Sequence, residues 1–526
     1  MKKYTVEELK QLNKEEIIAL FMQTQTQLSL FEERIAEMEA RLFGRKTEKL
    51  ETLSEQAFNE AEVESDDEAE EPSEEKVVRV RTKRPKGKLD KDLKDIPVRQ
   101  EVHELSDGKL TEIFGENGWK RLPDEVYRKL EYHPATREVV EHRIAVYASK
   151  TEAPRPSELL AHSLATPSLV AAIMNGKYTN ALPLYRISQE FEREGLNLSV
   201  PTMANWVIRC AERYLYPLWV RLRAELRRLP VAQADETPCH VQKDGRAANA
   251  KSFMFVYRSG EFLSDKPIVL YDYQRTRNSE HLENFLEGFS GVLVSDAFSG
   301  YHALENRHPE IRVAHCWAHA RRDFADALKA FKKTGPSKQR VKKTVAFQAL
   351  ERIGTFYRLE DEWKDLAPEE RLNRRPERLK PLVEAYFAWV KSIEPDTVVS
   401  ANTKDGLKYS VNQEARLKVF LENGAVPIDN SASERAIRPF CVGRSNWRVM
   451  DSVKVVQASA VVYSYGVVET AKANRLKPYK YLRHLFTELP KHMDETDASF
   501  LDNLLPCSDA IPDIYRKPVI QDTLGN

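Results

Sequence analysis

The chain has 526 residues, 41% of them hydrophobic, a length that suggests two to four domains. Lys and Arg number 81 and so do Asp and Glu, so the net charge does not by itself indicate a nucleic-acid partner. Five cysteines are scattered without the paired spacing of a disulfide framework or a structural zinc site: Cys210, Cys239, Cys316, Cys441 and Cys507. Because we find neither a signal peptide nor about 18 consecutive uncharged apolar residues, we expect a cytoplasmic protein that does not contact membranes.

Residues 1–50 contain a short heptad pattern. Apolar residues recur seven apart, with two more at the intervening positions: Phe21, Leu28, Ile35, Leu42, Phe31 and Met38. This pattern predicts a coiled-coil helix over about 6–43 that mediates self-association. The alternative is an amphipathic helix that packs on its own domain.

Residues 51–95 change abruptly in charge. The stretch 51–75 has twelve acids and no Lys or Arg, which predicts a disordered linker. The stretch 76–94 has nine basic residues against two acids. It is either an arm that contacts DNA phosphates or a solvated linker.

Residues 96–155 alternate apolar and polar side chains in EVVEHRIAVYA, which predicts a small β-containing module. Pro154 and Pro156 mark its end. Residues 156–230 then indicate short helices punctuated by Gly195 and Pro201, with Ser199 as a candidate helix cap. These helices form either a DNA-binding helix-turn-helix or a helical lead-in packed on the next domain.

A catalytic α/β domain is expected over residues 231–450. A β-prone run ends on Asp235, two strand-like runs and a helix pattern follow, and the strand GVLVS stops before Asp296. This order fits the mixed five-stranded sheet of an RNase H-like fold, in which the first and fourth strands are neighbours. Asp235 and Asp296 would then project from adjacent strand ends.

Neighbouring carboxylates repel each other unless a cation holds them. Two divalent ions about 3.5–4 Å apart would do so, and they would activate the attacking and leaving oxygens of an in-line phosphoryl displacement. Oxygen ligands suit Mg²⁺, so we expect two Mg²⁺ ions per active site, with Mn²⁺ as a substitute.

A third carboxylate is available in IDNSASERAIRPF. Asn430 and Glu434 lie four residues apart at a predicted helix start and would share one face. Arg435 and Arg438 follow at helical spacing and suit the phosphates beside a cleaved bond. Any one of these acids alone is more often a helix cap or a surface group, so the prediction rests on their combination.

The order of five sequence blocks resembles the IS66 family of bacterial insertion-sequence transposases. The blocks are ADETP, SDAFSGY, CWAHARRDF, DNSASERAIRP and VVYSYGVVETAKANRLKPYKYLRHLFTELP. Upstream, LFGRKTEK and LPLYRISQEFEREGLNLSVPTMANW also resemble the family's leucine-zipper segment and helical lead-in. The resemblance covers most of the chain. It implies an acidic-triad transposase with Asp235, Asp296 and Glu434 as the metal-binding catalytic residues, and a family-type C-terminal helical segment over 451–526.

The interval between Asp296 and Glu434 is too long for the rest of a minimal RNase H-like core, which implies a helical insertion at about 325–425. Within it, Lys329–Lys343 has seven basic residues and no acid, and suits either a DNA backbone or a solvated helical face.

The block CWAHARRDF places Cys316 and His319 three residues apart, beside Arg321 and Arg322. Two ligands do not make a zinc site, so we interpret Cys316 and His319 as supporting groups that pack and orient the active site. The two arginines are expected to contact DNA.

Members of the IS66 family commonly carry paired cysteines of a zinc-binding module between the coiled coil and the core. Residues 96–155 have no cysteine, so we expect a degenerate zinc-finger-like module that folds without zinc. No zinc is expected in the protein as a whole.

The combined prediction is a DNA transposase that cleaves insertion-sequence ends with Mg²⁺ and transfers them into target DNA. Expected partners are inverted-repeat ends, target DNA and further copies of the chain, and accessory proteins of the same element are an open question. The setting would be a bacterial cytoplasm, with the DNA-bound protein on the nucleoid. One alternative is an RNase H-like nuclease without joining activity. The other is an inactive or domesticated transposase that acts only as a DNA-binding oligomer.

Overall fold

The computed structural model describes residues 158–518, apart from 161–162, 244–245, 247–249, 264–265, 333–337, 395–396, 448–449, 453–455 and 494–496. The described residues belong to one compact unit. Predictions for residues 1–50, 51–95 and 96–155, including the coiled coil and the zinc-free module, lie outside them. Among the described helices, none combines the length and the apolar character needed to cross a membrane.

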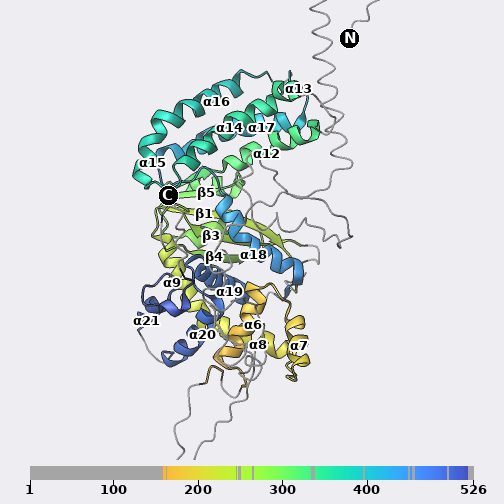
Figure 1. The fold of residues 1–526 in the computed structure, drawn as a ribbon, viewed down its shortest axis with the longest axis vertical. Helices are drawn as coiled ribbons and strands as arrows, with labels where there is room; N and C mark the ends of the chain where they lie inside the picture. The colour runs from red at the N-terminus through yellow and green to blue at the C-terminus, as the bar shows by residue number, and fades with distance from the viewer. Residues whose placement is uncertain are drawn as a thin grey trace, which may run out of the picture. The chain divides into compact units, whose positions relative to one another are not determined.

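A mixed five-stranded sheet lies at the centre of this unit (Figure 1). Its strands are β1 Val231–Cys239, β3 Ser252–Ser259, β4 Val269–Gln274, β5 Gly291–Ser295 and β6 Ile311–His315. The spatial order is β4-β3-β1-β5-β6. The pairs β1/β3 and β3/β4 are antiparallel, whereas β1/β5 and β5/β6 are parallel. The predicted adjacency of the first and fourth strands of the sheet is therefore confirmed.

The parallel strands are joined by helices. Helix α10 Ser279–Leu286 leads into β5, and α11 Ser299–Arg307 connects β5 to β6. Outside the main sheet, β2 Val241–Lys243 pairs in parallel with β7 Met450–Ser452.

Alternate residues of the sheet enter two separate hydrophobic cores, because successive strand side chains point to opposite faces. One core receives Ala232, Leu293 and Val313. The other receives Val231, Val294 and Ala314. Each face therefore needs its own cover of helices.

The first core is covered by helices that precede the sheet in the sequence and by helices that follow α18 Ser431–Trp447. The lead-in contributes α6 Pro167–Met174, α7 Leu184–Arg193, α8 Val200–Cys210 and α9 Tyr216–Arg227, with π-helical turns at Asn175–Thr179 and Ala211–Leu215. The C-terminal part contributes α19 Val456–Ala473, α20 Pro478–Glu488 and α21 Phe500–Leu504. Short 3-10 turns occur at Leu489–Lys491 and Asp513–Tyr515.

Local signals and side-chain contacts fix these helices in place. Ser199 caps α8, as predicted, by accepting a hydrogen bond from the Thr202 amide. Trp219 of α9 donates to the Tyr271 carbonyl of β4 at 3.2 Å. The lead-in is therefore packed on the sheet.

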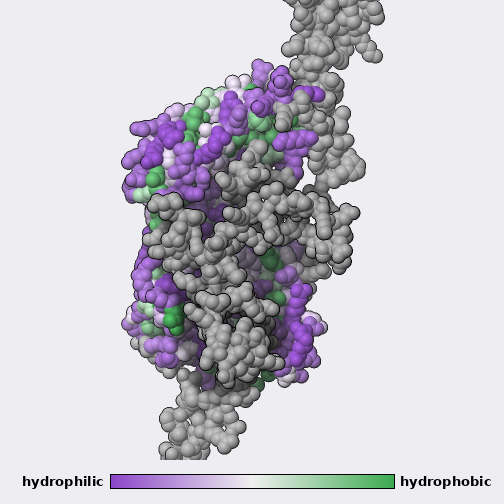
Figure 2. All heavy atoms as spheres, in the orientation of Figure 1, coloured by the Kyte–Doolittle hydropathy of each residue, from purple (hydrophilic) through white to green (hydrophobic). Residues whose placement is uncertain are grey.

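The second core is covered by helices inserted between β6 and α18 Ser431–Trp447. They are α12 Trp317–Lys332, α13 Lys338–Lys343, α14 Val345–Glu362, α15 Pro368–Arg374, α16 Lys380–Ser392 and α17 Ala401–Leu417, with short turns at Arg375–Leu379 and Val419–Glu422. Figure 1 shows these helices on one side of the sheet, with α9, α19 and α20 on the other. In Figure 2 the visible surface over the inserted helices is largely hydrophilic.

The inserted helices converge on a fully buried Trp317 at the start of α12. Its indole Nε1 donates to the Leu417 carbonyl at 2.8 Å, so it joins α12 to the end of α17. Four aromatic rings surround it: Phe356, Tyr386, Phe387 and Phe420. This arrangement orients α12 relative to β6, the strand that immediately precedes it.

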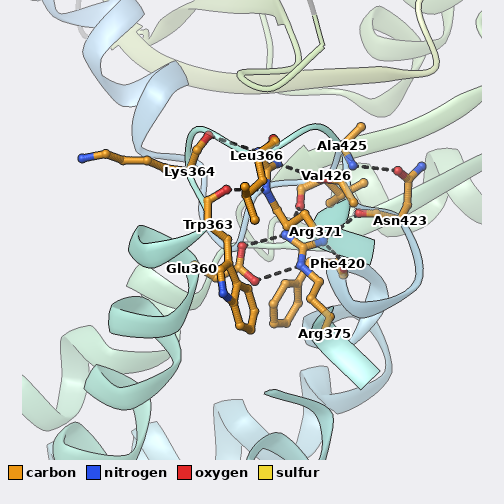
Figure 3. Close-up of polar contacts among 11 residues, drawn as sticks. Glu360, Trp363, Lys364, Leu366, Arg371, Arg375, Phe420, Asn423, Ala425 and Val426 are labelled. Atoms are coloured by element: carbon orange, nitrogen blue, oxygen red, sulfur yellow. Dashed lines mark hydrogen bonds and ion pairs between the residues drawn. The ribbon is translucent and has the colours of Figure 1, made fainter. Parts of the chain in front are cut away.

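Two buried arginines hold the loop that leads from the insertion toward α18 (Figure 3). Arg371 donates to the carbonyls of Gly424 and Leu366 at 2.7 and 2.9 Å. Arg375 pairs with Glu360 and also donates to the Val426 carbonyl at 3.0 Å. The loop backbone is thereby satisfied from inside the helical layer, which fixes the approach to α18.

Candidate active site

Strands β1 and β5 bring the first two predicted acids to the same level of the sheet. Gln233 of β1 pairs with Val294 of β5 in parallel register. Asp235 and Asp296 each follow two residues later, so alternation places them on one face of the sheet. The Asp296 Oδ1 atom accepts a hydrogen bond from the Phe298 amide at 3.0 Å, which orients its carboxylate at the strand end.

Helix α18 brings the third acid from a distant part of the chain. Asn430, directly before the helix, is buried and donates through Nδ2 to the Ala234 carbonyl at 2.7 Å. Its Oδ1 atom accepts from Gln233 Nε2 at 3.2 Å. Because the Glu434 amide also donates to the Asn430 carbonyl, the first turn of α18 is tied to β1.

The charges of the site act most strongly on Asp235. Burial, followed by repulsion from Glu236 and Glu434, raises the pKa of Asp235 well above its ordinary value, and Asp296 contributes in the same direction. The hydrogen bond from the Glu236 amide opposes this shift. The structure thus brings the three predicted acids together within electrostatic reach, in a setting that favours a bound cation.

A second group of site residues was missed from the sequence. Glu236 accepts from Tyr301 Oη at 2.6 Å and from Arg277 Nε at 2.7 Å. Arg277 Nη2 also lies 3.6 Å from Asp296 Oδ2, so it bridges the two acids. Burial, followed by repulsion from Asp296, raises the pKa of Glu236, while Tyr301 and Arg277 oppose the shift.

The signals for these missed residues differ. Glu236 follows Asp235 directly in ADETP, and that adjacency could have indicated it. Arg277 lies between β4 and α10, where no local pattern marks it, and it reaches the site only through the packing of that loop.

Cys316 and His319 lie beside Glu434. One ligand atom from each of the three residues lies within 4.8 Å of the others. Burial raises the pKa of the Cys316 thiol well above its ordinary value, and repulsion from Asp429 and Glu434 adds to the shift. Burial, followed by the charge of Arg322, lowers the pKa of His319 to about 4, so this imidazole is neutral near pH 7.

The four arginines predicted to contact DNA lie at different depths. Arg321 and Arg322 on α12 are half-buried, and Arg322 Nη2 lies 3.9 Å from Glu434 Oε1. Arg435 and Arg438 on α18 are exposed, and Arg435 pairs with Glu261 at 2.7 Å. Arg322 thus lies in contact with a triad acid.

Three family models match the chain. The model described as "Transposase IS66 family" matches residues 162–458, which is more than half of the chain. "IS66 C-terminal element" matches residues 467–507. "Transposase C of IS166 homeodomain" matches residues 30–98, which lie outside the described part of the structure.

Relatives from Sinorhizobium fredii also match, and each is named as an uncharacterized protein. The protein y4hP is 27% identical over 391 residues, which cover 73% of this chain and 70% of the relative. The protein y4jD is 27% identical over 367 residues, or 68% of each chain. The protein y4qI is 28% identical over 364 residues, which cover 67% of this chain and 64% of the relative.

Proposed function

The chain belongs to the IS66 family of transposases, and on this premise we propose that it is a DDE-type enzyme that cleaves insertion-sequence ends and transfers them into target DNA. The observation that carries the proposal is the geometry of the site, in which β1 and β5 bring Asp235 and Asp296 to one level of the sheet and Asn430 ties the start of α18, with Glu434, to β1. An RNase H-like core is part of the proposal. It is supported by the sheet, in which the strands follow the spatial order third, second, first, fourth and fifth.

The three carboxylates fit a hard divalent cation. Asp235 is half-buried and lies near other carboxylates, and its ionised form in such a setting is unfavourable unless a cation compensates it. An all-oxygen donor set suits Mg²⁺, with Mn²⁺ as a substitute, and we propose two ions held by Asp235, Asp296 and Glu434. When bound, such ions supply Lewis-acid activation of the attacking and leaving oxygens.

Two other residues of the chain hold and orient the acids of the site. Asn430 ties the start of α18 to β1 and so keeps Glu434 at the sheet edge. Arg277 contacts both Asp296 and Glu236 and so restrains these two carboxylates. Asn430 and Arg277 are therefore proposed as positioning residues, because their observed contacts are with the acids and the strand and not with DNA.

The reaction has two displacements at phosphorus. In the first, the oxygen of a water molecule bonds to phosphorus, the bond from phosphorus to the 3′ oxygen breaks, and a 3′-hydroxyl is released. In the second, that hydroxyl bonds to a target phosphorus, and a target 3′ oxygen leaves. We propose that the cationic side chains of Arg321, Arg322, Arg435 and Arg438 bind the flanking phosphates.

The remaining segments are proposed to supply DNA binding and assembly. Self-association would come from residues 1–50, and non-specific affinity from the basic arm at 76–94 and the run at 329–343. Residues 96–155 would recognise DNA through shape and phosphate contacts without zinc. The catalytic domain would comprise residues 231–450. The helices of residues 156–230 and 451–526 would support it by packing on its sheet.

A strand-transfer assay tests the function directly. The purified chain is incubated with Mg²⁺, DNA that carries the ends of its element, and a target plasmid. We expect a joined product. Asp296→Asn, Asp235→Asn or Glu434→Gln should lower cleavage on the order of 1,000-fold or more, because an amide is a poor ligand for Mg²⁺.

The control is Asp361→Asn, which changes an exposed acid of α14 whose side chain is 77% accessible. This variant should retain wild-type cleavage and joining. Cleavage without joining would identify a nuclease, and DNA binding without cleavage would identify an inactive transposase. Substantial Mg²⁺-dependent cleavage by the Asp296→Asn protein would remove that residue from the triad.

A further inference from the structure

Cys316, His319 and Glu434 form a cluster of three different ligand types at the edge of the carboxylate site. Cys316 lies between β6 and α12, His319 lies in the first turn of α12, and Glu434 lies in the first turn of α18. Their ligand atoms all lie within 4.8 Å of one another. The packing of α12 against the start of α18 therefore creates a grouping that neither segment contains alone.

Backbone hydrogen bonds from two segments reach the Cys316 sulfur, although burial favours its neutral thiol unless a cation is bound. The Asn430 amide donates to Sγ at 3.1 Å. The backbone of His319 also forms a hydrogen bond with this sulfur. Because N–H donors stabilise negative charge on sulfur, these contacts resemble the outer-shell hydrogen bonds that orient metal ligands.

The His319 ring is also incompletely satisfied. Its Nδ1 atom is buried and, within the described residues, has no hydrogen-bond partner. A buried polar atom without a partner is costly, and such cases call for an explanation such as an ion or a water molecule. Glu434 differs from the other two because its side chain is 39% accessible, so an ion has a route to the cluster from solvent.

We propose that Cys316, His319 and Glu434 bind a soft divalent cation, with Zn²⁺ as the best match. Thiolate and imidazole ligands favour Zn²⁺ over Mg²⁺, which prefers oxygen. One thiolate and one carboxylate would balance the charge of a divalent ion. Three protein ligands leave a fourth tetrahedral position for water, so the site would be open.

This site is separate in chemistry from the proposed Mg²⁺ site but shares Glu434 with it. In the sequence only Cys316 and His319 lie close together, and two ligands are too few to predict a zinc site. The fold adds the third ligand from α18. The binding proposal does not depend on whether the chain cleaves DNA, so the two can fail separately.

Titration of the full chain with Co²⁺, without DNA or Mg²⁺, tests the proposal. Cobalt bound to a thiolate gives a sulfur-to-metal charge-transfer band in the near ultraviolet. We expect this band to saturate at one Co²⁺ per chain and to disappear when Zn²⁺ is added. Cys316→Ser should abolish the band, whereas Cys507→Ser, which changes a half-buried cysteine outside the cluster, should leave it unchanged.

A second variant guards against a folding defect caused by changing a buried cysteine. Glu434→Gln alters an accessible side chain and should keep the band, because the thiolate remains, while weakening Zn²⁺ binding by at least about 10-fold. Equilibrium dialysis with Zn²⁺ measures this affinity. A wild-type Co²⁺ complex without the band, a band that persists in Cys316→Ser, or unchanged Zn²⁺ affinity in Glu434→Gln would each overturn the site.

Discussion

Replacing Arg375 by methionine tests whether the buried arginine network of Figure 3 stabilises the inserted helices. Arg375 is fully buried and donates to the two Glu360 carboxylate oxygens at 2.8 and 2.7 Å. It also donates to the carbonyls of Asn423 and Val426 at 2.8 and 3.0 Å. Methionine keeps much of the side-chain length but leaves Glu360 as a buried charge without this partner. Removal of one partner of a buried ion pair costs about 3–5 kcal/mol, and we expect a loss of stability in this range.

Arg378→Met is the matched control. Arg378 lies three residues further along and pairs with Glu362 at 3.1 Å, but the two side chains are 51% and 53% accessible. An exposed pair of this kind contributes at most about 1 kcal/mol. Urea unfolding followed by tryptophan fluorescence measures both variants, because Trp317 and Trp389 lie in the inserted helices and Trp363 directly follows α14.

The double variant Arg375→Met with Glu360→Leu separates charge from packing. It leaves no isolated buried charge, so it should be more stable than Arg375→Met alone. Equal losses for Arg375→Met and Arg378→Met would refute the argument. The argument would also be refuted if the double variant lost as much stability as Arg375→Met and Glu360→Leu together.

Three further predictions concern the metals and the assembly. Because the pKa of Asp235 is raised, Mg²⁺ must displace a proton at low pH, so the apparent Mg²⁺ affinity in cleavage assays should rise as pH increases through that pKa and then level off. An affinity that falls with pH would contradict this. Stoichiometric Zn²⁺ should inhibit Mg²⁺-dependent cleavage, because both metals use Glu434, and Cys316→Ser should be less inhibited relative to its own zinc-free rate. Deletion of residues 1–50 should lower the oligomeric state in sedimentation, and an unchanged state would exclude the zipper.

Local sequence patterns determined the positions of the sheet strands and their acids. The apolar run before Asp296 forms β5, as predicted, but the prediction that the first strand ends on Asp235 was wrong, because β1 continues to Cys239 in its pairing with β3. Short runs of this kind are recognised from alternation and composition. The parallel pairing of β1 with β5 runs to Gln233 and Val294, which brings Asp235 and Asp296 to the same level of the sheet. Ser199 was predictable as a helix cap for the same reason, because a cap depends only on the residues next to it.

Other features were decided only by the tertiary structure. Arg277 reaches Glu236 of β1 from the loop between β4 and α10. The cluster at Cys316 gains Glu434 only when the chain returns from the insertion. Such contacts join residues that are far apart in the sequence, and their geometry depends on how whole helices pack. A local pattern can therefore indicate which acids belong to which strands, whereas the cations and ligands that surround those acids are set by the packing of distant segments.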